Sequence, residues 1–202
     1  MTRFVITGTD TGIGKTVFSA ALASATGTPY WKPVQAGLEE ETDSETVARL
    51  AHVAIVPEAY RLALPASPHL AAEREGRSID PDELMPPTGD IVIEGAGGAL
   101  VPLRADCLYA DLFARWQIPV IVCARTSLGT INHSLLTIEA LRARSVPLHG
   151  LVFLGDAMPD SEAIIPAICG VRRLGRLPHL DPLTPESLAR AFNANFDLTD
   201  FA

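Results

Sequence analysis

The chain has 202 residues and a mass of 21.5 kDa, and 48% of its residues are hydrophobic while 20% are charged, so it can bury a substantial core. With 24 acidic and 16 basic residues the net charge is −8, which argues against a basic surface for nucleic-acid binding. The longest apolar runs have the length of strands rather than of membrane spans, and the amino terminus lacks the pattern of a secretory signal. We therefore expect a cytoplasmic protein, folded as one domain over residues 1–202, that binds neither nucleic acid nor membrane.

Short apolar runs alternate with longer segments of helical periodicity, which predicts an α/β fold with a mostly parallel sheet and helices on both faces. In chain order, the expected strands are Arg3–Thr7, Tyr30–Val34, Asp90–Glu94, Pro119–Ala124, Gly150–Leu154 and Arg173–Leu177. The expected helices are Thr16–Ala25, Asp43–His52, Asp106–Trp116, Thr130–Arg144, Asp160–Cys169 and Pro185–Phe196.

Two segments carry further expectations. Pro65–Pro87 is rich in proline, serine and charge, and we expect an excursion over the sheet edge with helices at Pro68–Glu75 and Pro81–Met85 and no strand. In the fourth long helix, one apolar stripe is predicted at Ile131, Leu135, Ile138 and Leu141. The three cysteines are widely spaced and form no pair, so we expect them to be small buried side chains: Cys107, Cys123 and Cys169.

A glycine-rich loop, residues 8–16 (GTDTGIGKT), joins the first strand to the first helix. This is the pattern of a phosphate-binding loop, except that Gly8 stands one position early. Its glycines allow backbone N–H groups and the helix dipole to face a phosphate. Lys15 can reach the β- and γ-phosphates, and the Thr16 hydroxyl can bind Mg²⁺. An ordinary glycine-rich turn is the alternative, but Gly-Lys-Thr at the start of a helix favours nucleotide binding.

Two carboxylates and a lysine are expected near the same end of the sheet. Glu94 ends a strand before residues 95–98 (GAGG), whose N–H groups can approach a phosphate or a developing anion; the alternative is an exposed acid before a plain turn. Asp43 lies in an acidic run and either faces this crevice or only caps the following helix. Lys32 lies at the end of the second strand. It is either an ordinary surface charge or a functional residue of this crevice.

Five segments occur in an order typical of one enzyme family: residues 7–16 (TGTDTGIGKT), 32–34 (KPV), 67–69 (SPH), 94–98 (EGAGG) and 128–133 (LGTINH). In these segments the chain resembles the dethiobiotin synthetases, P-loop ligases of biotin biosynthesis. The Gly-Lys-Thr element alone fits many proteins, whereas the five segments together are specific. The resemblance implies a three-layer P-loop NTPase fold.

The resemblance also implies a reaction and a site. ATP, with Mg²⁺, would close a ureido ring on 7,8-diaminopelargonate with CO₂, through a carbamate and a carbamic–phosphoric anhydride. Lys15 and Lys32 would be the catalytic cations, and the metal ligands would be Thr16, Glu94 and Asp43, or Glu45 in place of Asp43. The remaining nucleotide contacts would come from Gly12, Ile13, Gly14, Val17, Gly95, Ala96, Gly97, Pro178, His179 and Leu180. Substrate would be bound by Thr11, Lys32, Ala36, Gly129 and Asn132, the last two from the partner in a homodimer with shared active sites.

Three positions depart from the family pattern. Gly12 replaces an acidic residue that is common in the phosphate loop, and Ala36 replaces a small hydroxyl residue that hydrogen-bonds substrate. Leu154 stands where several members have an asparagine that reads adenine, which leaves the preferred base open. The segment Pro178–Leu180 would contact the base, unless it is only the end of a strand.

Two other functions share this type of fold. A P-loop ATPase that regulates a protein partner would have the same phosphate loop, but it has no need of Lys32 beside metal-binding carboxylates or of a second helix start directed at an anion. An amidotransferase of the cobyrinate type would carry a glutaminase domain with a nucleophilic cysteine, and the chain has no segment that resembles one. The ligase is therefore the favoured function.

Overall fold

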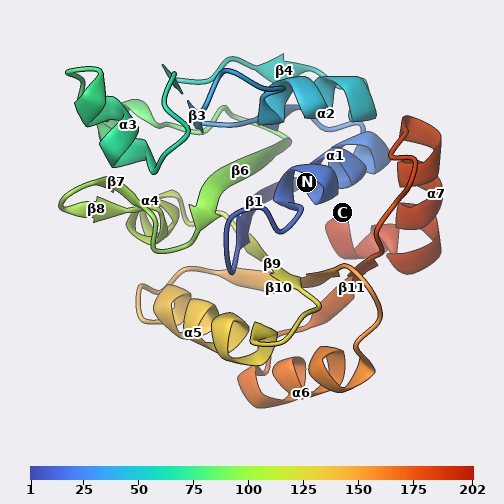
Figure 1. Ribbon diagram of the computed structural model, residues 1–202. Helices are drawn as coiled ribbons and strands as arrows, with labels where there is room; N and C mark the ends of the chain where they lie inside the picture. Colours follow the sequence, from blue (N-terminus) through green and yellow to red (C-terminus); the bar gives the residue numbers. More distant parts are fainter.

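The centre of the molecule, a computed structural model that describes residues 1–202, is a seven-stranded parallel sheet (Figure 1). The strand order is β11-β10-β9-β1-β6-β2-β4, and all pairs are parallel. The strands are β1 (Arg3–Gly8), β2 (Tyr30–Trp31), β4 (Ile55–Val56), β6 (Ile91–Gly98), β9 (Val120–Arg125), β10 (Leu148–Leu154) and β11 (Arg173–Leu177). The predicted α/β fold is confirmed.

Helices cover both faces of the sheet and make two separate cores. The first core is completed by α1 (Lys15–Thr26), α2 (Asp43–Ala51) and α7 (Pro185–Asn195). The second is completed by α3 (Pro68–Arg74), α4 (Tyr109–Trp116), α5 (Thr130–Arg142) and α6 (Pro159–Cys169). Side chains of β1 alternate between them, with Phe4 and Ile6 in the first core and Val5 in the second. Burial on both faces explains why these strands are continuously apolar.

Short elements were not predicted, because two or three residues carry no periodic signal. They include β4 and two small sheets, one of β3 (Val34–Ala36) with β5 (Tyr60–Leu62) and one of β7 (Pro102–Arg104) with β8 (Cys107–Leu108). The chain ends in a 3₁₀ helix, η2 (Leu198–Phe201). The prediction for Pro65–Pro87 is confirmed in its main features, since this segment holds α3 and η1 (Pro81–Glu83) and no strand.

Most predicted elements lie within two residues of the observed bounds, and three differ by more. The expected strand Tyr30–Val34 is two strands of different sheets, because Pro33 has no N–H to donate and its carbonyl instead accepts hydrogen bonds from the N–H groups of Ala59 and Tyr60 at 2.9 and 3.1 Å. The expected helix Asp106–Trp116 begins only at Tyr109, since the preceding residues pair as β8. The strand expected to end at Glu94 continues as β6 to Gly98, which lies beside Gly8 of β1.

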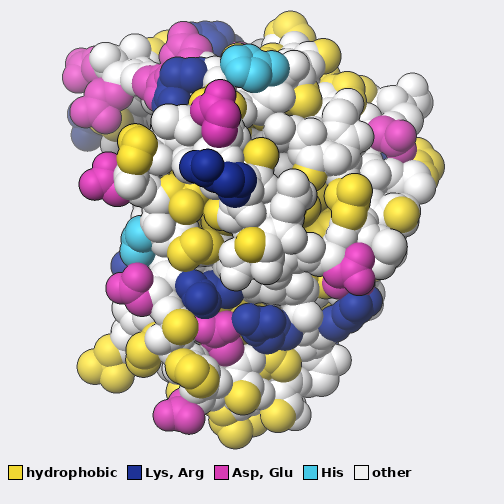
Figure 2. Space-filling view, turned by 90° about the vertical axis from the view of Figure 1, so that its right-hand side faces the viewer, with side chains coloured by type: hydrophobic (Ala, Val, Ile, Leu, Met, Phe, Trp, Pro, Cys, Tyr) yellow, Lys and Arg dark blue, Asp and Glu magenta, His cyan; other side chains and the backbone are white.

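Buried and exposed positions also test the sequence predictions. The three cysteines are free and buried, as expected. Ile138 and Leu141 are buried and Leu135 packs against the core, but Ile131 is 39% exposed, so the predicted stripe is wrong at its first position. None of the helices combines the length and the hydrophobicity that a membrane span requires. On the face that carries α7, acidic and basic side chains are interspersed among hydrophobic and uncharged ones (Figure 2).

Candidate functional site

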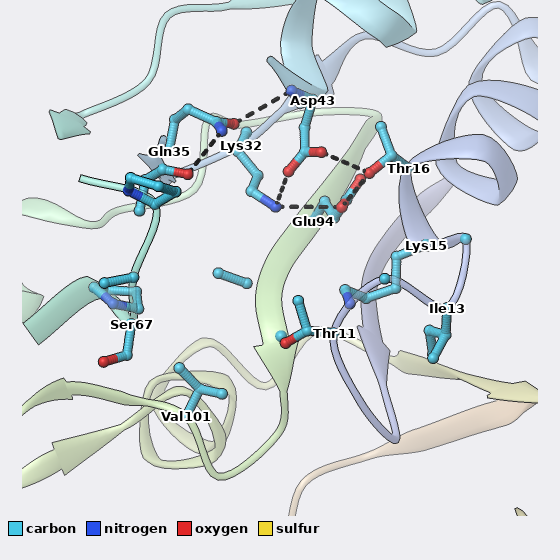
Figure 3. A pocket seen from close by; sticks show the side chains of 18 residues that line it. Thr11, Ile13, Lys15, Thr16, Lys32, Gln35, Asp43, Ser67, Glu94 and Val101 are labelled. Carbon is cyan, nitrogen blue, oxygen red and sulfur yellow. Dashed lines mark hydrogen bonds and ion pairs between the residues drawn. The ribbon is translucent and has the colours of Figure 1, made fainter. Parts of the chain in front are cut away.

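A cavity of about 590 Å³ lies where the loops after β1 and β2 meet β6 (Figure 3). The phosphate loop forms one wall, and the segment around Lys32 and the start of α2 form another. The other lining residues come from Pro65–Pro68, from β6 and from Val101. These are the carboxyl ends of parallel strands, where open α/β sheets bind ligands.

The phosphate loop has the backbone that its glycines predict. Gly12 and Gly14 adopt φ angles of 67° and 100°, in the left-handed region that favours glycine, and α1 begins immediately afterwards at Lys15. The Lys15 ammonium folds back over the loop and donates to the carbonyl oxygen of Asp10 at 3.0 Å. Burial lowers the pKa of Lys15, and the nearby Glu94 carboxylate offsets this only in part. The loop therefore holds a partly desolvated cation without an ion-paired carboxylate.

The second lysine lies in a different environment, between two carboxylates (Figure 3). Lys32 Nζ is 2.5 Å from Asp43 Oδ2 and 3.2 Å from Glu94 Oε1, and it also donates to the Gly95 carbonyl oxygen at 3.2 Å. Burial by itself would lower the pKa of Lys32, but the attraction of Glu94 and Asp43 outweighs it, so the pKa is raised. For Asp43, burial would raise the pKa, and Lys32 and Thr16 together lower it. Lys32 and Asp43 are thus held as an ion pair.

Thr16, Asp43 and Glu94 bring three hard oxygen ligands together. The Thr16 hydroxyl lies 2.8 Å from Asp43 Oδ1 and 2.9 Å from Glu94 Oε1 (Figure 3). Carboxylate and hydroxyl oxygens are the donors that Mg²⁺ prefers, and it is usually held by one or two carboxylates beside substrate phosphates. The residues present therefore fit a magnesium ion next to the phosphate loop.

The start of α2 distinguishes the two acidic candidates. Thr42 is the N-cap, since its hydroxyl accepts from the N–H of Glu45 at 3.3 Å while the Glu45 carboxylate accepts from the N–H of Thr42 at 2.8 Å. The interpretation of Asp43 as the helix cap is therefore wrong, because Asp43 is the first helical residue. Its carboxylate faces the cavity, whereas that of Glu45 is bound in the capping box.

A second cavity, of about 210 Å³, lies on the other side of the phosphate loop. It brings together seven of the residues predicted to bind nucleotide: Gly12, Ile13, Gly14, Val17, Pro178, His179 and Leu180. Leu154 contributes an apolar wall, and its Cδ1 lies 3.4 Å from the point that a Cβ atom would occupy at Gly14. The cavity wall is therefore apolar at position 154, where several members of the family have an asparagine.

Comparison with known proteins supports the same family. The chain matches a family model described as an AAA domain over residues 2–187. It is 73% identical over 201 residues to the protein of Sphingopyxis alaskensis named ATP-dependent dethiobiotin synthetase BioD, with 100% of both chains covered. It is 63% identical to the protein of the same name from Agrobacterium fabrum, over 98% of this chain and 96% of that one. The chain belongs to the dethiobiotin synthetase family.

Solved structures agree with the fold. A ParA family ATPase from Chlorobium tepidum superposes with a TM-score of 0.59 at 11% identity, over 96% of this chain and 93% of the other. The MinC:MinD cell division complex of Aquifex aeolicus gives a TM-score of 0.52 at 13% identity, over 93% and 85%. At these identities the likeness shows a shared P-loop NTPase-like architecture alone.

The residues implied by the synthetase resemblance do not all line the two cavities. Thr11 and Ala36 line the large cavity with Lys32, as do Ala96 and Gly97. Gly95 does not line it and contributes only its carbonyl oxygen, to Lys32. Gly129 and Asn132 are exposed at the start of α5, outside both cavities.

Two polar residues of this synthetase site were missed by sequence reasoning. The side-chain oxygen of Gln35, Oε1, accepts from the backbone N–H of Asp43 at 3.3 Å, and its side-chain nitrogen, Nε2, donates to the Ala36 and Gly37 carbonyl oxygens at 3.3 and 3.2 Å. The Tyr30 hydroxyl donates to Glu94 Oε2 at 2.9 Å. Position 30 lies in an apolar strand, so only the pairing of β2 with β6 reveals its contact; Gln35 follows the Lys-Pro-Val segment, which was the available signal.

Proposed function

We propose that this synthetase closes the ureido ring of dethiobiotin, using 7,8-diaminopelargonate, CO₂ and ATP. One substrate amine captures CO₂ as a carbamate, the γ-phosphoryl group of ATP transfers to a carbamate oxygen, and the second amine attacks the mixed anhydride and releases phosphate. The observation that carries this proposal is that one cavity joins the phosphate loop to Lys32. Such a cavity has room for a phosphate chain beside a second anion.

The two lysines support the charge changes of this reaction. Phosphoryl transfer is accelerated mainly by positioning and by neutralising charge on the transferred group. Lys15 would neutralise the β- and γ-phosphates, and Lys32 would lie beside the carbamate. These are the only two lysines in the chain. Because Lys32 is already paired with Asp43 and Glu94, it stays charged whether or not substrate is bound.

Thr16, Asp43 and Glu94 would hold the magnesium ion. When bound there, the ion would supply positive charge to the β- and γ-phosphate oxygens. The chain's own contribution is to orient the ligands: Lys32 and Thr16 bind both carboxylates, and Gln35 fixes the backbone of Asp43. Since ATP and the other small substrates are cytoplasmic metabolites, we place the reaction in the cytoplasm.

We also propose that the synthetase is a homodimer with shared sites. Leu128 is fully exposed, and Ile131 and Leu136 are 39% and 56% exposed on the same segment as Asn132. Exposed apolar side chains grouped in this way are typical of a protein contact. Contact through this surface would bring Gly129 and Asn132 to the substrate carboxylate in the partner's cavity.

Phosphate release tests the activity directly. Purified protein is assayed with Mg-ATP and bicarbonate, with and without the diamine, and dethiobiotin is measured as product. We expect the diamine to stimulate phosphate release strongly. ATP hydrolysis at the same rate with and without the diamine would instead support a partner-regulated ATPase.

Repeating the assay with CTP and GTP tests which nucleotide base the second cavity accepts. Because Leu154 offers no hydrogen bond, we expect kcat/KM to vary by less than about tenfold among the nucleotides.

Mixing two inactive variants tests the shared sites. Lys15→Gln disables the phosphate loop of its own chain, and Asn132→Ala removes a contact offered to the partner. In a mixed dimer one site keeps both intact residues, so random mixing should restore about a quarter of wild-type activity. No recovery, with each variant still dimeric, would show that Asn132 serves its own chain.

A further inference from the structure

Glu94 is bound through both of its carboxylate oxygens, and the two oxygens have different partners. Oε1 faces the cavity side of the cluster, with the Thr16 hydroxyl at 2.9 Å and Lys32 Nζ at 3.2 Å. Oε2 accepts the Tyr30 hydroxyl at 2.9 Å. Glu94 is 1% exposed and Tyr30 is fully buried, so water has no access to replace that bond. The Tyr30 hydroxyl is therefore the partner of Oε2 at a place closed to water.

The sheet register explains why Tyr30 reaches this oxygen. In the parallel pair of β2 and β6, Tyr30 lies opposite Val92, and both side chains belong to the core that α1 covers. Glu94 is two residues beyond Val92 and therefore points to the same face of the sheet. The tyrosine ring spans this offset and places its hydroxyl at the carboxylate. The contact is fixed by the backbone of both strands.

We propose that Tyr30 is a positioning residue of the synthetase, whose hydroxyl holds Glu94 Oε2 so that Oε1 is presented to Thr16, Lys32 and a divalent cation. This rests on the metal site of the proposed function. A carboxylate released from Tyr30 can rotate about its Cγ–Cδ bond and turn its oxygens away from Thr16. Groups that orient a metal ligand in this way typically contribute 10- to 100-fold to metal affinity or activity.

Mn²⁺ binding to the ADP complex tests the proposal apart from activity. The free Mn²⁺ signal in electron paramagnetic resonance gives its affinity for wild type and for Tyr30→Phe. The matched control is Tyr60→Phe, which removes a partly buried hydroxyl that donates to the Glu83 carboxylate and accepts from the N–H of Asp80, both outside the cavity. We expect Mn²⁺ to bind Tyr30→Phe about 10-fold more weakly and Tyr60→Phe within twofold of wild type. The Mg²⁺ concentration for half-maximal turnover should rise in parallel, with the KM for the diamine unchanged.

Two results separate the possible failures. Unchanged Mn²⁺ affinity in Tyr30→Phe, with a melting temperature lowered as in Tyr60→Phe, would show that the bond only stabilises the fold and would overturn the proposal. A wild-type ADP complex that does not bind Mn²⁺ would instead overturn the metal site of the proposed function.

A measurement on the wild-type chain does not depend on how the variant folds. The chain has 3 tyrosines, so labelling tyrosine Cζ with ¹³C gives three resonances, which Tyr60→Phe and Tyr109→Phe assign. Addition of Mg²⁺ to the ADP complex should shift the Tyr30 resonance and leave that of Tyr60 in place. If the wild-type ADP complex binds Mn²⁺ and the Tyr30 resonance still does not move with Mg²⁺, the proposal is overturned.

Discussion

The two lysines of the chain both line one cavity, but their surroundings differ. Lys15 belongs to the phosphate loop, where its ammonium has a backbone carbonyl oxygen as partner. Lys32 belongs to the break between β2 and β3, where two carboxylates hold it at 2.5 and 3.2 Å. Both side chains are buried. The loop thus presents a cation without an anion, whereas the strand break presents a cation that is already neutralised.

This difference predicts that one lysine contributes mainly to phosphate binding and the other mainly to the geometry of the site. A buried cation without a counter-ion is costly in the free protein, and a phosphate group relieves that cost when it binds. A lysine held by two carboxylates gains less from an incoming anion, but it keeps one geometry before and after binding. We therefore expect the phosphate-loop lysine to act on nucleotide affinity and the strand-break lysine to act on turnover.

The largest effect is expected for Lys15→Gln. The variant loses the cation that faces the β- and γ-phosphates, so ATP should bind much more weakly and turnover should fall as well. Removing one preorganised group that neutralises transition-state charge typically costs 10²- to 10³-fold in kcat, so kcat/KM should fall by at least about 10³-fold. Isothermal titration with ATP and steady-state kinetics measure the two effects. Unchanged ATP affinity would contradict the assignment of Lys15 to binding.

Lys32→Gln should lower turnover by about 10²-fold while ATP affinity stays within a few-fold of wild type. The loss is selective because the phosphate loop remains complete. Arg49→Gln serves as control, since Arg49 forms an ion pair with Glu41 on the exposed side of α2. Equal and mild effects of Lys15→Gln and Lys32→Gln on turnover would remove Lys32 from the mechanism and would break the distinction between the two regions.

The sequence predicted the backbone of the loop correctly and that of the strand break only in part, for a physical reason. The loop is made of consecutive residues, so its glycines, Lys15 and Thr16 could be placed from local geometry alone. The surroundings of Lys32 join three separate segments, and they depend on β2 lying beside β6 in the sheet. The fold class followed from hydrophobic patterning, but neither the continuation of β6 through Glu94 nor the contact of Tyr30 has a local signal.

A smaller effect concerns the stability of the nucleotide-free protein, for which the two substitutions should differ in sign. Lys32→Gln leaves Asp43 and Glu94 close together without their cation, and breaking a buried ion pair typically costs about 3 kcal/mol. Lys15→Gln removes a buried charge that has no carboxylate partner, so we expect it to leave the free energy of unfolding unchanged or to raise it. Urea denaturation at pH 7 measures both, and a loss of stability in Lys15→Gln as large as that in Lys32→Gln would contradict the comparison.

The smallest effect is a difference between two titrations, and it tests the comparison most directly. Burial lowers the pKa of Lys15 from 10.5, whereas the two carboxylates raise that of Lys32 above it. With ¹³C at lysine Cε the wild-type protein should give two side-chain signals, which Lys15→Gln assigns, and the Lys15 signal should titrate at the lower pH.

The two shifts affect stability with opposite signs. The contribution of Lys32 is fully present below its ordinary pKa of 10.5 and is lost as the pH rises through its folded value. The charge of Lys15 destabilises the free protein at pH values below the pKa that Lys15 has in the folded state, and this cost disappears as the pH rises towards 10.5.

Binding of ADP should raise the pKa of Lys15, because the β-phosphate supplies the missing anion, and should leave the pKa of Lys32 nearly unchanged. If ADP moved Lys32 and not Lys15, the roles of the two regions would be reversed.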